Sequence, residues 1–144
     1  MATPAAPLIL LPVDGSASSV RAAKHCVTIA KAFKASVILL NVQPEIEDWQ
    51  THGIGRKAAE DHLNALAQEA MAQAARALAD AGIAFESVVE HGDAPGVIAR
   101  VAADRKCAAV VMGTRGQSEL KSRLMGAVGM KVIHLVRIPV TFVH

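Results

Sequence analysis

Five apolar runs divide the chain, and each predicts a buried β-strand. They occupy residues 8–13, 35–42, 83–91, 107–113 and 138–144. The first two are continuous rather than alternating, which is typical of strands covered on both faces in a parallel sheet. The run over 83–91 alternates in part and therefore favours a place nearer the edge of that sheet.

Helical spacing fills the intervals between these runs. Apolar residues recur every three or four positions over residues 18–33 and 54–81, and shorter helices are expected within 92–106 and over 127–136. Gly82 is a typical stop for the second helix. The expected buried faces of the first three helices are Ala23, Cys26, Val27, Ala30 and Phe33, then Leu63, Leu66, Ala67, Ala70, Ala74, Leu78 and Ala81, then Ile98, Val101 and Ala102.

Strand and helix thus alternate from one end of the chain to the other, without a linker, repeat or low-complexity segment. This order predicts one α/β domain over residues 1–144, a three-layer α/β/α arrangement around an open, five-stranded and mainly parallel sheet. Ligands of such sheets bind beyond the carboxyl ends of the strands, where the strand order switches. A site is therefore expected among residues 14–18, 42–44, 91–95 and 113–129.

Composition narrows the class of protein. The 144 residues are 52% hydrophobic and 19% charged, which excludes a disordered chain. The net charge is only +2 and 3% of the residues are aromatic, so the chain has little positive charge to attract phosphates and few rings on which bases could stack. No nucleic-acid partner is therefore predicted. The apolar run near the N-terminus is interrupted by Pro12 and ends at Asp14, so we expect neither a membrane span nor a signal peptide, but a cytoplasmic protein. Cys26 and Cys107 form no CxxC motif and are expected to be buried thiols in a reducing compartment.

Motifs for catalysis or metal binding are missing from the sequence. The six histidines include no HExxH motif and no pair four residues apart, so no metal site is predicted. No GxSxG motif occurs, and Ser16, Ser18 and Ser19 are typical of a turn and a helix cap. Asp14 is a single carboxylate without an evident general-base partner, so no catalytic residue is predicted.

A glycine-rich segment follows the fourth predicted strand, in the stretch "MGTRGQSELKSRLMGAVG". Gly113, Gly116 and Gly126 have the spacing Gly-x2-Gly-x9-Gly, which is neither a Walker A loop nor a GxGxxG fingerprint. Backbone N–H groups of such a loop can hold a phosphate at a helix N-terminus, but the same glycines can also serve only a turn. The residues of this loop alone leave both interpretations open.

Taken together, these segments resemble a single-domain universal stress protein of the UspA-like kind. The resemblance rests on "LILLPVDGSASS", "ASVILLNVQP", "EHGDAPGVIARVAADRKCAAVVMGTRG", the Gly-x2-Gly-x9-Gly spacing and the closing "IPVTFVH". It implies a Rossmann-like fold that binds adenine nucleotides. It also implies a homodimer formed through the last strand, at Ile138, Val140 and Phe142.

The resemblance further implies which residues would contact a nucleotide. Val13 and Val42 would border the adenine, and Asp14 would lie near the ribose or the phosphates. The backbone at Met112 would hold the nucleotide, and the glycine loop and the next helix would cover the ribose and phosphates. The implied nucleotide-binding residues are Val13, Asp14, Val42, Met112, Gly113, Arg115, Gly116, Gly126, Ala127, Val128 and Gly129.

Two of these positions depart from the family's pattern. Members that bind nucleotides usually carry hydroxyls directly after the third glycine and again near position 129, where this sequence has Ala127 and Gly129. A hydrogen bond to a charged group contributes about 1.5–3 kcal/mol, so the departure weakens the expected grip on phosphate. The expected ligand is ATP or another adenine nucleotide such as AMP, with Mg²⁺ as a candidate companion ion.

Three functions fit this sequence. The first is a stress-response sensor that binds an adenine nucleotide. The second is a dimeric interaction module of the same fold that does not bind ATP. The third is a slow ATPase, for which Asp14 is the only supporting residue.

Overall fold

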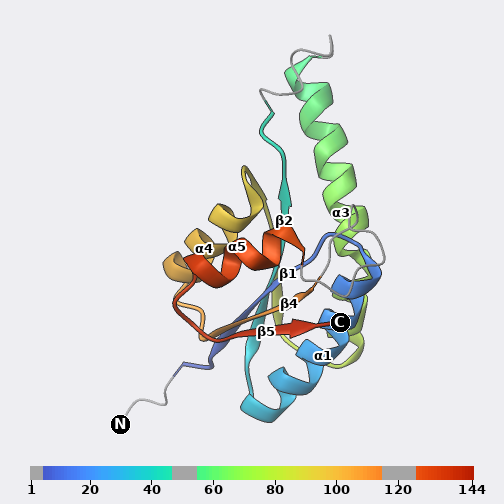
Figure 1. Cartoon of the computed structure of the whole chain (residues 1–144). Coiled ribbons are helices and arrows are strands. Elements are labelled where there is room, and N and C mark those ends of the chain that lie inside the picture. Colours follow the sequence, from blue (N-terminus) through green and yellow to red (C-terminus); the bar gives the residue numbers. More distant parts are fainter. Residues whose placement is uncertain (1–4, 47–54, 115–125) are drawn as a thin grey trace.

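Strands and helices alternate along the chain in this computed structural model, which describes residues 5–46, 55–114 and 126–144 (Figure 1). The elements are β1 (Leu8–Pro12), α1 (Ala17–Phe33), β2 (Ser36–Gln43), α3 (Arg56–Asp80), β3 (Phe85–His91), α4 (Ala94–Asp104), β4 (Ala109–Gly113), α5 (Ala127–Leu135) and β5 (Val140–Val143). The order matches the one that the hydrophobic pattern predicts.

The strands form one sheet in the order β3-β2-β1-β4-β5, and every neighbouring pair is parallel. The five-stranded parallel sheet of the sequence analysis is therefore confirmed. Among the described strands, β3 and β5 are the two edges, as the partial alternation of residues 83–91 predicts for β3.

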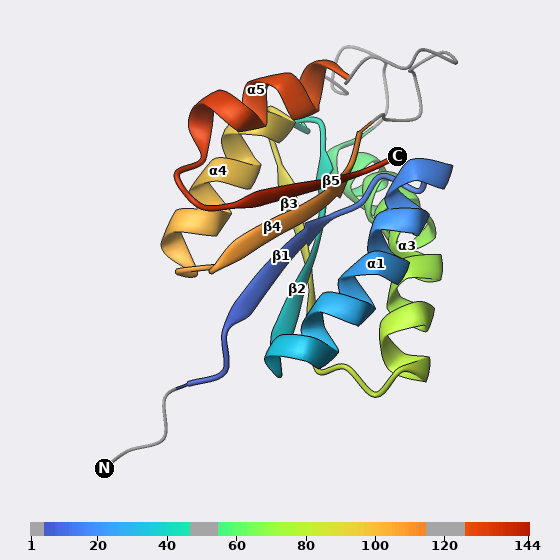
Figure 2. The same ribbon diagram turned by 60° about the horizontal axis from the view of Figure 1, so that its bottom comes forward.

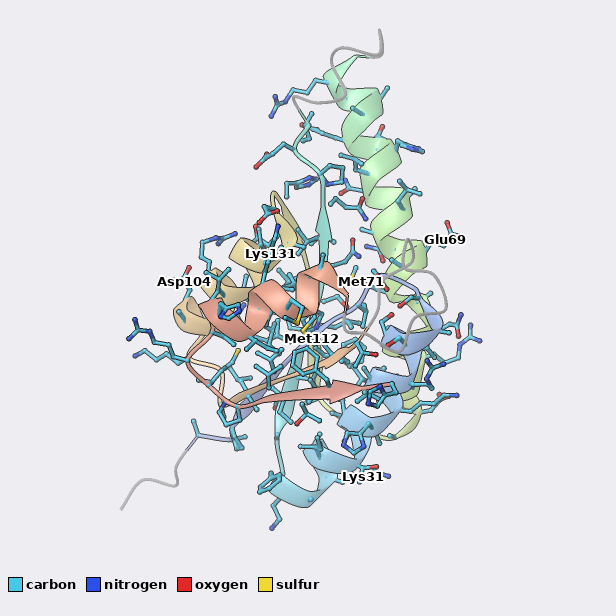
Figure 3. The ribbon with its side chains drawn as sticks, in the orientation of Figure 1. Lys31, Glu69, Met71, Asp104, Met112 and Lys131 are labelled. Carbon is cyan, nitrogen blue, oxygen red and sulfur yellow. The ribbon has the colours of Figure 1, made fainter. Side chains whose placement is uncertain are left out.

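Helices cover both faces of the sheet, α1 and α3 on one side and α4 and α5 on the other (Figure 2). Successive side chains of a strand point to opposite faces, so each strand serves two cores. In β1, Ile9 and Leu11 pack with α1 and α3, whereas Leu10 packs with α4 and α5. Figure 3 shows one methionine from each core, Met71 on α3 and Met112 on β4.

Local signals set the ends of the helices. The Ser16 hydroxyl accepts a hydrogen bond from the Ser19 N–H at 3.2 Å and caps α1. After α3, Gly82 has a φ of 72°, the left-handed conformation that glycine adopts without strain. Pro95 lies in the first turn of α4, where its missing N–H costs nothing.

Two apolar residues that the sequence predicts on the buried faces of their helices are exposed instead. Phe33 is 69% exposed, because α1 ends at this residue and the chain turns back through Lys34, whose φ is 53°. Leu66 is 38% exposed, since the buried stripe of α3 is narrow and advances mostly in steps of four residues. That stripe consists of Ala59, Leu63, Ala67, Met71, Ala74 and Leu78, of which the sequence analysis missed Ala59 and Met71.

Both cysteines are buried, as predicted. Burial raises the pKa of the Cys26 thiol to about 12 and also raises the pKa of Cys107. No helix among the described residues combines the length and the apolar character needed to cross a bilayer.

Helix α1 approaches the end of β4 so closely that only glycine fits at position 113. A Cβ atom there would lie 2.8 Å from the Ser18 carbonyl carbon and 2.9 Å from the Ser19 nitrogen. Both of these are backbone atoms, so the clash could be relieved only by moving the helix. The Ser18 hydroxyl also donates to the Val143 carbonyl at 3.1 Å, and the Thr114 N–H donates to the same oxygen at 3.0 Å. The ends of β4 and β5 and the start of α1 are thus held together at one point.

We expect Gly113→Ala to lower the free energy of unfolding by about 1–3 kcal/mol, the usual cost of an overpacked site. Urea denaturation measures this change. The matched control is Gly96→Ala on α4, where the nearest atom to an added Cβ is 3.9 Å away. Alanine replaces glycine there in an exposed helix and should raise stability by up to about 1 kcal/mol. Equal stability of the Gly113→Ala variant and the parent protein would contradict the close approach.

Candidate functional site

The strand order switches between β1 and β4. The chain leaves β1 for α1 on one face of the sheet, and it leaves the neighbouring β4 toward α5 on the other face (Figures 1 and 2). Connections that diverge in this way leave a crevice at the carboxyl ends of the two strands, which is where open α/β sheets bind ligands. The candidate site therefore lies at the ends of β1, β2 and β4, beside the first turns of α1 and α5.

The end of β1 is tied to β2 by a buried side chain. The Val13 N–H donates to the Leu40 carbonyl at 2.8 Å, and the Asn41 amide donates to the Val13 carbonyl at 2.8 Å. Asn41 is itself completed by the Gln43 amide, which donates to its side-chain oxygen at 2.7 Å. Asn41 is thus a positioning residue that the sequence analysis missed, although a polar residue inside the apolar run "ILLNV" signals a buried hydrogen-bond partner.

Asp14 lies in the turn that leads from β1 into α1. Its Oδ1 atom accepts a hydrogen bond from the Ser16 N–H at 2.9 Å, and Gly15 supplies a φ of 83°. The carboxylate therefore helps to shape the turn. Asp14 follows β1, as the sequence predicts, and is half-buried there. Among the described residues, no three His, Cys, Asp or Glu side chains gather to form a metal site.

Strand β2 extends beyond β1 and forms a step beside this turn. Pro12 is paired with Leu40, whereas Val42 and Gln43 are paired only with β3. Val42 packs on the core of α4 and α5, and so does Met112. Val13 packs on the opposite core, with α1 and α3. The structure thus brings Val42 and Met112 to one face of the sheet but places the Val13 side chain on the other.

Helix α5 begins directly above the end of β4. The Gly126 N–H donates to the Thr114 carbonyl at 2.6 Å, and the first hydrogen bond of the helix runs from the Met130 N–H to the Gly126 carbonyl at 3.1 Å. Gly126 is the cap residue and has no side chain to cover the N–H groups of the first turn. The positive end of the helix dipole therefore faces the switch point, an arrangement suited to an anion.

The other residues of the predicted loop are placed as follows. Ala127 and Val128 are exposed and Gly129 is buried. Arg115 and Gly116 lie outside the described residues. Thr114, which the sequence analysis did not single out, is buried at the head of the loop.

Ion pairs join β3 to α4 and to Arg105, the residue that follows α4. Arg105 contacts Glu86 near the start of β3, and its guanidinium lowers the pKa of that carboxyl. Arg100 contacts Glu90 at 3.3 Å. Closer to the site, the His91 ring lies 3.1 Å from the Pro44 carbonyl and the Gly92 N–H donates to the Gln43 carbonyl, so the end of β3 supports the extension of β2.

Comparisons with known proteins agree with this architecture. The model of the universal stress protein family matches residues 8–144. A universal stress protein of Methanocaldococcus jannaschii is 30% identical over 142 residues, which cover 94% of this chain and 80% of that protein. The structure of UspA from Lactobacillus plantarum superposes with a TM-score of 0.81 at 20% identity and covers 99% of this chain and 100% of that one. A universal stress protein in complex with cAMP superposes with a TM-score of 0.72 at 25% identity, over 96% of this chain and 97% of the other. The chain belongs to the universal stress protein family.

Proposed function

We propose that this protein is a cytoplasmic stress-response sensor that binds an adenine nucleotide, ATP or AMP, at the carboxyl ends of β1, β2 and β4. The observation that carries the proposal is the first turn of α5, which opens without a capping side chain at the switch between β1 and β4. The similar structure in complex with cAMP supports an adenine nucleotide as the ligand.

The phosphates would bind at the start of α5. Backbone N–H groups of Val128 and Gly129 in the first turn of α5, together with the helix dipole, would supply the attraction, since neither Ala127 nor Gly129 carries a hydroxyl. The adenine would lie on the same face of the sheet, beside Val42 and Met112, which share one apolar core there. Asp14, Arg115 and Gly116 complete the proposed contacts to the ribose and phosphates. Mg²⁺ would depend mainly on phosphate oxygens, because Asp14 is the one protein carboxylate proposed at the site.

We expect the protein to bind AMP and ATP in isothermal titration calorimetry at millimolar or lower ligand concentration, and GMP to serve as the matched control. We expect ATP to bind only slightly more tightly than AMP, because its two additional phosphates meet no hydroxyl at positions 127 and 129. Absence of heat and of any thermal shift with every adenine nucleotide would contradict the sensor and leave the interaction module as the function.

A hydroxyl added at the start of α5 should strengthen the binding of the nucleotide phosphates. Ala127 is exposed in the first turn of α5, so Ala127→Ser adds a hydroxyl without disturbing the core. We expect ATP to bind about tenfold more tightly, the effect of one added hydrogen bond to a charged group. Calorimetry measures the change, and Ala103→Ser, at an exposed position near the end of α4, is the control that should leave the affinity unaltered. An unchanged affinity in Ala127→Ser would show that the missing hydroxyl does not limit the site.

We further propose a homodimer formed through β5. The carbonyls of Pro139 and Val143 accept hydrogen bonds from the N–H groups of Val110 on β4 and of Thr114, the residue that follows β4. Because alternate residues of a strand direct their N–H and C=O groups to opposite sides, those of Val140 and Phe142 point to the open edge of the sheet. The side chains of Ile138, Val140 and Phe142 are half-buried against the core of α4 and α5, so the backbone of the edge is what remains to pair with a second copy.

Val140→Pro tests this dimer because it removes an outward N–H and spares the hydrogen bonds to β4. We expect the variant to sediment as a monomer in analytical ultracentrifugation, whereas the parent protein sediments as a dimer. Val140→Ala shortens the same side chain but keeps the N–H, and it should remain dimeric. A Val140→Pro variant that stays dimeric would exclude β5 pairing as the contact.

A further inference from the structure

Thr114 carries a buried hydroxyl without a hydrogen-bond partner. The residue is 5% exposed, and its Oγ1 atom is the one buried side-chain nitrogen or oxygen among the described residues for which no partner is found. Buried polar groups are nearly always paired, because an unpaired one loses its hydration without compensation. Its position therefore calls for an explanation.

Thr114 lies beside the start of α5. Along β4, Met112 packs with α4 and α5, and a Cβ atom added at Gly113 would point toward α1. The hydrogen bonding between β4 and β5 continues to Thr114, whose N–H donates to the Val143 carbonyl. Because side chains alternate between the two faces along a strand, the Thr114 side chain points to the same face as Met112, the face covered by α5. Its own carbonyl accepts the hydrogen bond from Gly126, the residue that caps α5.

The serines on the other side of the switch point are already engaged. Ser16 caps α1, the Ser18 hydroxyl donates to the Val143 carbonyl, and the Ser19 hydroxyl donates to the Ser16 carbonyl at 3.0 Å. Ala127 and Gly129 bring no hydroxyl to α5. Of the described residues that border the site, Thr114 is thus the one with a hydroxyl still available.

We propose that the Thr114 hydroxyl donates a hydrogen bond to a phosphate oxygen of the bound nucleotide at the N-terminus of α5. The inference rests on the proposed function and assigns it a phosphate-binding side chain. Rotation about χ1 between staggered positions redirects a threonine hydroxyl without moving the backbone, so the group can turn to a ligand. The low-dielectric surroundings of a buried residue strengthen such a bond, and the phosphate charge strengthens it further.

The test compares AMP with adenosine, which lacks the phosphate, in calorimetry on the parent protein and on Thr114→Val. This substitution keeps the shape of the side chain and removes the hydroxyl. We expect the affinity for AMP to fall about tenfold and the affinity for adenosine to stay within about twofold. Thr114→Ser, which retains a hydroxyl, should rescue AMP binding, and Thr28→Val on the exposed face of α1 should leave both affinities unchanged.

A second measurement is the melting temperature without ligand. A hydroxyl that has no partner in the free protein stabilises nothing, so Thr114→Val should melt at or above the temperature of the parent protein. A clearly lower melting temperature would overturn the proposal, since it would show that the hydroxyl is already paired. Thr114→Ala, which also lacks the hydroxyl, replaces the valine variant in the titrations if that variant does not fold.

The outcomes separate the two proposals. If the parent protein binds AMP and Thr114→Val binds it equally well, or loses AMP and adenosine to the same extent, the role of Thr114 is wrong and the nucleotide site stands. If the parent protein binds neither AMP nor adenosine, the proposed function is wrong and the role of Thr114 falls with it.

Discussion

The contact of α1 with the end of β4 is the constraint on which the candidate site depends. Glycine at position 113 lets the backbone of Ser18 and Ser19 reach the sheet, and the Val143 carbonyl then accepts hydrogen bonds from both Ser18 and Thr114. A side chain at position 113 would push α1 away and break this convergence. The geometry of the switch point is therefore fixed by backbone packing before any ligand contact is considered.

This packing also decides which chemistry remains for a ligand. Tight docking of α1 engages its serines in capping and in the bond to β5, so they hold the frame and leave the ligand to other groups. On the opposite side, α5 begins at Gly126 and Ala127, neither of which carries a hydrogen-bonding side chain, and the Gly126 N–H already donates to the Thr114 carbonyl. Under the proposed function, α1 holds the frame and α5 faces the anion, so a single hydroxyl near α5 would contribute more to binding than it would in a site rich in hydroxyls.

The sequence predicted the fold well because its signals were local. Continuous apolar runs identified strands buried on both faces, and Ser16 and Gly82 marked helix ends through their own backbone preferences. Phe33 escaped prediction because its exposure depends on where the chain turns back into β2. The sequence analysis did not address which face of the sheet Val13 and Val42 occupy, for a related reason. A period of two places Val13 with Leu11 and Val42 with Leu40, but which helices cover each face follows from the strand order, and no short sequence window encodes that order.

Asn41 and Thr114 show why polar residues at this edge of the sheet had to be judged from the structure. Both are buried, and both come directly after or within an apolar stretch of a strand, so their sequence contexts are similar. The Asn41 side chain both donates and accepts, to Val13 and from Gln43, whereas the Thr114 hydroxyl has no partner among the described residues. The fold pairs the buried side chain of Asn41 at the end of β2 with two partners. Loose packing is therefore a poor explanation for the unpaired hydroxyl of Thr114 at the end of β4. The contrast is the physical reason to expect that a ligand completes Thr114.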